Sequence, residues 1–196
     1  MNRLHKILPY AALLLFVLQL LLMLGSWIFS ATMPGSEVRS LLTGEGLRWF
    51  LGGFSRLLST PLLVWLLLLA MSYGVLRGSR LLHRVTTYRE NWARWMTLLL
   101  GVVYVGFILL LTVTPHAVLL SATGCLWPSP FSDAFVPLVA FGMMVLSAFY
   151  GIASGHLPTF RDVFNALSDG IRSAATFVVF YVLIIQFYES LRYVLG

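Results

Sequence analysis

The chain has 196 residues, of which 59% are hydrophobic and only 10% charged, and its mean hydropathy is +0.89. A soluble domain carries about 25% charged residues, so this chain cannot cover one globule with polar side chains, and a cytosolic enzyme is excluded. The net charge of +6 would suit a nucleic-acid partner, but the basic residues are scattered between apolar runs and form no stripe, so no nucleic acid is expected.

Five apolar stretches are each long enough to cross a lipid bilayer, which takes roughly 20 residues of helix. They lie at about residues 7–29, 57–76, 95–114, 134–153 and 173–195. The sequence therefore predicts an all-α fold, a polytopic membrane helix bundle with about five transmembrane helices. The chain is expected to form a single membrane domain over residues 1–196, with the lipid bilayer as its main partner.

The first and last stretches each leave an alternative open. Arg3 and Lys6 precede the first stretch, as in a signal peptide. A signal core is only about 7–15 residues long, which favours a retained helix. The last stretch contains Glu189 and Arg192, and these charged side chains must lie near an interface or face protein.

Between the first two spans, apolar residues recur at helical spacing while Arg48, Ser55 and Arg56 fall on the other side. The apolar set is Leu47, Phe50, Leu51, Phe54, Leu57 and Leu58. This pattern predicts a short helix over about residues 47–56 that lies in the membrane interface and leads into the second span. Gly52 and Gly53 weaken this helix and mark a candidate bend.

The basic residues indicate the orientation of the spans, because Lys and Arg gather in cytoplasmic loops. With the N-terminus inside, nine of the thirteen basic residues are cytoplasmic. The sequence therefore predicts a multi-pass protein of the cell inner (plasma) membrane with a cytoplasmic N-terminus. Residues 77–94 hold five of these arginines. A site for nucleic acid or lipid headgroups is one interpretation, but an anchor of topology is favoured.

Catalytic and metal-binding patterns are not evident in the sequence. The single cysteine, Cys125, has no partner for a disulfide or a metal. The four histidines fall at span ends or in loops, where an interfacial role is favoured over metal binding: His5, His83, His116 and His156. No cofactor and no metal are expected, and the chain is not expected to be an enzyme.

Polar groups inside the spans are the remaining candidates for a substrate site. They are Gln19 in the first span and Gln186 and Glu189 in the last. The favoured alternative is that these side chains hydrogen-bond a neighbouring helix, as polar groups in membrane bundles commonly do.

Two patterns concern the fourth span. Pro137 lies one turn inside it, where a proline removes a backbone hydrogen bond and can kink the helix. Ser147, Gly151 and Gly155 follow the four-residue spacing of small residues that allows close helix packing. The small-residue spacing says nothing about a substrate, whereas irregular backbone at membrane depth, as at Pro137, is typical of transporters.

The approach to the fifth span carries capping signals. Thr159 followed by Asp162 predicts the start of a short helix in the last loop. Asp169 is expected just ahead of the fifth span, where an acidic residue complements the helix dipole.

Several short blocks are similar, in order and spacing, to one family of membrane transporters. The blocks are residues 41–50 (LLTGEGLRWF), 61–62 (PL), 72–75 (SYGV), 129–131 (SPF), 136–141 (VPLVAF), 150–155 (YGIASG), 162–163 (DV), 186–187 (QF) and 195–196 (LG). They resemble the p-aminobenzoyl-glutamate transporter (AbgT) family. The resemblance implies a dimeric transporter fold with re-entrant hairpins around a central substrate site.

The departures from the family are also informative. Residues 76–94 lead directly from the second family helix to a much later one, and residues 193–196 (YVLG) depart from the family's polar tetrapeptide. The chain is therefore expected to be an abbreviated member that lacks the hairpin regions and the C-terminal half. No substrate-contacting residue of the family can be carried over to a position of this sequence.

Two functions follow as expectations. The first is transmembrane transport of p-aminobenzoyl-glutamate or related aromatic folate catabolites, incomplete in one chain and therefore dependent on a homo-oligomer or a companion membrane chain. The second is a non-transporting membrane scaffold or subunit built from the family's outer helices.

Overall fold

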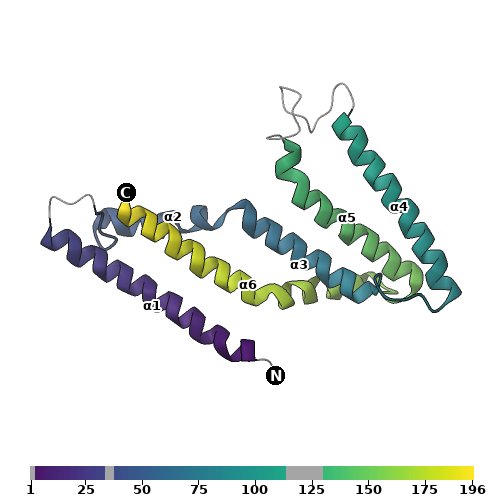
Figure 1. The fold of residues 1–196 in the computed structure, drawn as a ribbon, viewed down its shortest axis with the longest axis horizontal. Coiled ribbons are helices and arrows are strands. Elements are labelled where there is room, and N and C mark those ends of the chain that lie inside the picture. The colour runs from purple at the N-terminus through teal and green to yellow at the C-terminus, as the bar shows by residue number, and fades with distance from the viewer. Residues whose placement is uncertain (1–2, 34–37, 114–129) are drawn as a thin grey trace. The chain divides into compact units, whose positions relative to one another are not determined.

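The computed structural model describes residues 3–33, 38–113 and 130–196. Every regular element in these ranges is a helix (Figure 1). In chain order the helices are α1 (Arg3–Thr32), α2 (Gly44–Leu58), α3 (Pro61–Ser79), α4 (Tyr88–Val113), α5 (Pro130–Ser154) and α6 (Phe160–Leu195). The predicted all-α fold is confirmed. Two sequence candidates, His116 and Cys125, lie outside the described residues, and so does the start of the block at 129–131.

Five of the six described helices are long and apolar enough to cross a membrane. The spans are Ile7–Thr32, Pro61–Ser79, Tyr88–Thr112, Phe131–Ser154 and Phe160–Leu195. This agrees with the five spans expected from the sequence, and α2 is the additional short helix. Large apolar side chains on these spans are exposed to their surroundings, as Val102 (72%) and Leu99 (64%) illustrate, as expected of helices that contact lipid.

Helix α2 is amphipathic and begins at a defined cap. The Thr43 hydroxyl accepts a hydrogen bond from the Gly46 backbone N–H at 3.2 Å, which satisfies one of the free donors of the first turn. The helix runs unbroken through the two glycines at 52 and 53 and ends at Leu58. The interruption before α3 has a simple cause, because a residue that precedes proline avoids helical backbone and Pro61 suits the first position of the next helix.

Helix α6 is longer than the sequence indicated. Thr159 and Asp162 form a reciprocal cap, in which the Asp162 carboxylate accepts from the Thr159 N–H at 3.1 Å and the Asp162 N–H donates to the Thr159 hydroxyl at 3.2 Å. The expected short helix does not end in the loop but continues to Leu195. Asp169 therefore lies inside α6 rather than ahead of a span, because no proline interrupts the backbone after the cap.

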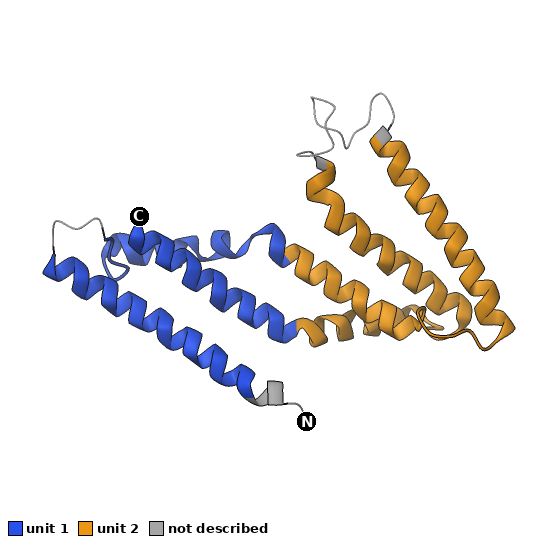
Figure 2. Cartoon of the chain, in the orientation of Figure 1, with its two compact units in different colours: residues 1–63, 175–196 blue, residues 64–174 orange. Residues whose placement is uncertain are grey.

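The chain divides into two compact units (Figure 2). Unit 1 comprises residues 1–63 and 175–196, and unit 2 comprises residues 64–174. Both α3 and α6 contribute to each unit. That the chain forms a single membrane domain stays a prediction.

In unit 1 the C-terminal end of α6 contacts the segment between α1 and α2. The Arg39 N–H donates to the Val194 carbonyl at 3.1 Å, and the Trp49 and Tyr193 rings stack with centroids 4.4 Å apart. The Ser26 hydroxyl accepts from the Leu41 N–H at 3.2 Å. These contacts hold the two ends of the chain in one unit.

In unit 2 the core forms around Leu157, which follows α5. Leu157 packs with Val75 and Ala166, and a Cβ placed on Gly151 would lie 2.8 Å from a Leu157 methyl carbon. Gly155 has a φ of +87°, a left-handed conformation that favours glycine at the end of a helix. Of the small residues at 147, 151 and 155, Gly151 thus leaves room for Leu157 and Gly155 forms the turn after α5.

Helices α4 and α5 pack side by side within unit 2 (Figure 1). The Tyr104 hydroxyl donates to the Leu138 carbonyl at 2.8 Å, and the glycine at position 142 leaves room for the Tyr104 ring. Helix α5 continues through Pro137 without interruption. Whether Pro137 kinks the helix stays a prediction.

Candidate functional site

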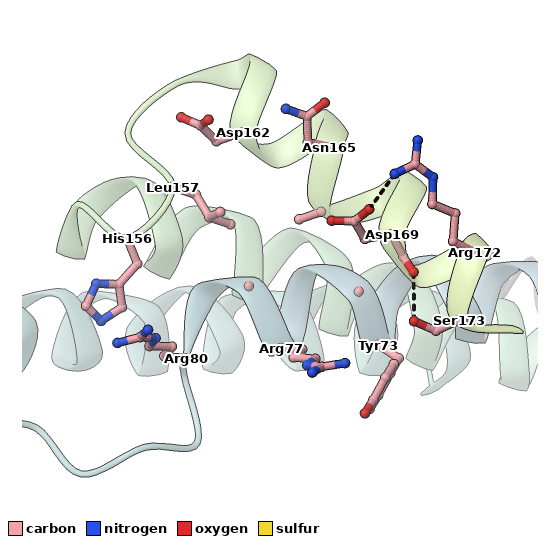
Figure 3. Close-up of a pocket in the computed structure, with 13 residues that line it drawn as sticks. Tyr73, Arg77, Arg80, His156, Leu157, Asp162, Asn165, Asp169, Arg172 and Ser173 are labelled. Atoms are coloured by element: carbon pink, nitrogen blue, oxygen red, sulfur yellow. Dashed lines mark hydrogen bonds and ion pairs between the residues drawn. The ribbon is translucent and has the colours of Figure 1, made fainter. Parts of the chain in front are cut away.

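A polar cavity of about 760 Å³ lies in unit 2 between α3 and the N-terminal part of α6 (Figure 3). Its polar lining comes from α3 and the residue after it, from the loop before α6, and from α6 itself. These side chains are Tyr73, Arg77, Arg80, His156, Asp162, Asn165, Asp169, Arg172 and Ser173. Three guanidinium groups and two carboxylates therefore share one cavity.

Small residues hold the two helices close together beside this cavity. A Cβ on Gly74 would collide with the Ala166 carbonyl oxygen and with the Gly170 backbone, and a Cβ on Gly170 would collide with the Ala70 carbonyl oxygen. Each helix carries three small residues at four-residue spacing, Ala70, Gly74 and Gly78 on α3 and Ala166, Gly170 and Ala174 on α6. This is the pattern that permits close crossing of membrane helices.

The carboxylates in the cavity already have partners. Asp169 forms an ion pair with Arg172 at 3.2 Å, which Figure 3 marks with a dashed line. Asp162 accepts hydrogen bonds from the Thr159 N–H and hydroxyl, the latter at 2.6 Å. Among the described residues, the side chains of Arg77 and Arg80 have neither a hydrogen bond nor an ion pair. The cavity therefore has a net charge of +1 from three arginines and two aspartates, and two of its guanidinium groups, Arg77 and Arg80, make no ion pair with a described residue.

Contacts of α4 hold the loops on either side of this region. The Glu90 carboxylate accepts from the Thr86 N–H at 2.8 Å and lies 3.5 Å from His156 Nε2. Arg89 donates to the Ala153 carbonyl at 2.8 Å, and Arg94 donates to the His83 carbonyl at 2.6 Å. Two of the five arginines between residues 77 and 94 thus bind backbone oxygens, whereas Arg77 and Arg80 do not.

The three side chains that the sequence singled out belong to unit 1 and do not line the cavity. Gln19 donates to the Ser190 hydroxyl on α6 at 2.8 Å, so this amide binds a neighbouring helix. Gln186 is only 7% exposed, and its two side-chain polar atoms have no partner in the described chain. Glu189 is half-buried, with no hydrogen bond or ion pair to any described residue. That these three residues bind substrate stays a prediction.

Sequence reasoning missed the cavity and the crossing that supports it. The four-residue spacing of small residues on α3 and α6 was a usable signal for the crossing. The sequence gives no sign that Arg77 and Arg172 line the same cavity, because they lie on different helices that are far apart in the chain. Among the described residues, no group of three or more His, Cys, Asp or Glu could hold a metal ion.

A comparison with protein-family models decides the family. The model described as the AbgT putative transporter family matches residues 78–193, more than half of the chain. The chain belongs to the AbgT transporter family. No curated protein and no solved structure matches it. The AbgT match covers the cavity residues on α6 and the blocks at 136–141 and 150–155, while the blocks at 41–50 and 72–75 precede the matched range.

Membership in the AbgT family makes this chain a multi-pass membrane protein of a transporter family. A family of transporters agrees with the expectation that the chain is not an enzyme. The substrate, the particular membrane and the orientation are not part of that identification.

Proposed function

We propose that this AbgT-family chain takes part in the transmembrane transport of p-aminobenzoyl-glutamate or related aromatic folate catabolites, and that it does so in an oligomer or with a companion chain. The observation that carries the proposal is the family match over residues 78–193. The substrate rests on the resemblance of the short sequence blocks to the p-aminobenzoyl-glutamate transporters.

The requirement for further protein rests on the scarcity of polar groups in the middle of the spans. Residues 8–29, 62–76, 95–112, 134–154 and 173–188 contain no Asp, Glu, Lys or Arg. The substrate carries two carboxylates, and an unpaired buried carboxylate is costly. Transporters meet this demand with polar groups or broken-helix ends near the midplane. Two amides, Gln19 and Gln186, cannot replace the hydration of two carboxylates.

Uptake into proteoliposomes tests the proposal. We expect no saturable uptake of labelled p-aminobenzoyl-glutamate by crosslink-verified monomers, and saturable uptake by an oligomer or by the chain with its companion. Liposomes without protein and competition by unlabelled substrate are the controls. Saturable uptake by monomers would overturn the need for further protein.

A membrane scaffold is the second candidate function. It is favoured by the same uncharged span centres and by the exposed apolar side chains along α4, where Val102 is 72% exposed. Binding measurements with p-aminobenzoyl-glutamate separate the two functions. If every oligomeric state of the purified chain fails to bind this molecule, the scaffold stands and the transport proposal fails.

We further propose that the chain lies in the inner membrane with its N-terminus in the cytoplasm. Nine of its thirteen basic residues would then be cytoplasmic, as the distribution of Lys and Arg in membrane proteins favours. The measurement is cysteine labelling of a Gly196→Cys variant in a Cys125→Ser background. We expect an impermeant reagent to label intact cells from the outside. Labelling that occurs only after permeabilisation would reverse the orientation.

A further inference from the structure

We propose that the cavity between α3 and α6 binds the phosphate of an anionic phospholipid headgroup through Arg77 and Arg80. The cavity measures about 760 Å³, which is large enough for a headgroup. The proposal concerns a lipid site and does not depend on which substrate the protein transports.

The first argument is the net positive charge of the cavity, where three arginines face two aspartates and both Arg77 and Arg80 are exposed. Asp169 is paired with Arg172 at 3.2 Å, and Asp162 keeps its negative charge but accepts its hydrogen bonds from Thr159. Within the described ranges, no carboxylate lies in ion-pair contact with Arg77 or Arg80. An anion that enters the cavity therefore meets two guanidinium groups whose N–H groups donate no hydrogen bond to a described residue. A guanidinium group can donate two parallel hydrogen bonds to the oxygens of one phosphate.

A second argument comes from a neutral donor on α6. Asn165 is exposed on α6 and lines the cavity, and its side-chain amide has no hydrogen bond to a described residue. Figure 3 shows Asn165 on α6, one turn before Asp169, with Arg77 and Arg80 on the α3 side. An amide N–H can donate to a phosphate oxygen. The cavity thus offers donors from both helices.

The backbone at Arg80 supplies a third argument. Arg80 has a φ of 57° and is the only described non-glycine residue with a positive φ. It directly follows α3, a position where glycine is usual because it adopts this conformation without strain. An arginine kept in a strained conformation points to a function for its side chain.

The position of the cavity along the helices identifies the ligand as a lipid. Arg77 lies in the last turn of α3, and α3 is a membrane span of 19 residues. The cavity is therefore at the end of the span, where headgroups lie. Tyr73, which also lines the cavity, is 53% exposed, and tyrosine is common at membrane interfaces. Basic pockets between membrane helices at this level bind anionic headgroups.

The experiment measures lipid retention by the full-length protein. Purified protein is transferred to nanodiscs of phosphatidylglycerol mixed with phosphatidylcholine, and the lipids that remain bound are counted by native mass spectrometry after release. We expect selective retention of phosphatidylglycerol. Near a membrane surface each Arg contributes about a fivefold preference for anionic lipid, so Arg77→Gln should reduce the selectivity about fivefold.

Arg80→Gly separates binding from folding. Glycine relieves the strain of the positive φ, so we expect an unchanged or higher melting temperature together with an approximately fivefold loss of selectivity. Arg84→Gln is the matched control, because Arg84 carries the same charge in the neighbouring loop but does not line the cavity. If Arg84→Gln lowers selectivity as much as the two cavity variants do, the effect comes from loop charge and the proposal is overturned.

Two competitors distinguish a lipid from a soluble anion. Inorganic phosphate and p-aminobenzoyl-glutamate are added separately, each at millimolar concentration. We expect neither to displace bound phosphatidylglycerol. If inorganic phosphate displaces the lipid, the cavity is a general anion site. If p-aminobenzoyl-glutamate displaces it, the cavity belongs to the transport pathway. Either displacement overturns the lipid assignment and leaves the proposed transport function intact.

Discussion

Gly170→Ala is expected to destabilise unit 2 by about 1–3 kcal/mol, the usual cost of overpacking a tight contact. The added methyl group would collide with the Ala70 carbonyl oxygen and lie 3.0 Å from the Gly74 Cα. Both obstacles are backbone, so no side chain can rotate away and α3 must separate from α6. Thermal unfolding in detergent measures the change.

Gly106→Ala is the matched control for this prediction. Gly106 is also inside a membrane helix, α4, and a Cβ placed there would meet nothing within 4 Å. The same substitution should therefore stabilise the protein, by about 0.5–1 kcal/mol, because alanine loses less backbone freedom in a helix. Equal effects of the two substitutions would show that the glycine crossing does not form.

Gln186→Leu is expected to raise the free energy of unfolding by about 1–3 kcal/mol, since a buried polar group without a partner costs this much. Gln186 is 7% exposed, and neither its side-chain N–H donor nor its oxygen has a partner in the described chain. Leucine has a similar size and carries no polar atoms. Thermal unfolding in detergent again provides the measurement.

Gln19→Leu is the opposite case. It removes the hydrogen bond from Gln19 to the Ser190 hydroxyl, and interhelical bonds of this kind contribute about 0.6 kcal/mol in membrane proteins. We expect a small loss of stability. If Gln186→Leu also lowers stability, the Gln186 amide has a partner in an oligomer. If Gln186→Leu raises stability but lowers uptake, the amide acts in transport at the expense of stability.

The helical fold could be predicted because long runs of uncharged, apolar residues are visible in the sequence itself. Uncharged runs of about 20 residues have few alternatives to spanning helices, and α2 follows from the spacing of Leu47, Phe50 and Phe54. The boundary of α6 could not be predicted in the same way. Asp169 and Arg172 look like loop residues in the sequence, but their exposed side chains pair with each other at 3.2 Å on consecutive turns of α6.

The candidate site was much harder to predict. Five arginines between residues 77 and 94 look equivalent in the sequence, where each one suits a topology anchor. In the structure, Arg89 and Arg94 bind the carbonyls of Ala153 and His83, and only tertiary contacts make that difference. The four-residue spacing of small residues does not by itself identify a helix crossing. It includes both Gly151 and Gly74, but Gly151 packs against the Leu157 side chain, whereas Gly74 packs against the backbone of α6.

The discontinuity of unit 1 has a consequence for biosynthesis. Residues 1–63 leave the ribosome before their partners on α6, residues 175–196, because all of unit 2 lies between them in the sequence. At roughly 5–20 residues per second, Trp49 and Gln19 wait roughly 7–34 s for Tyr193 and Ser190 while unit 2 is being inserted. The nascent protein must therefore keep α1 and α2 at the membrane by their own apolar surface until α6 completes the unit that they began.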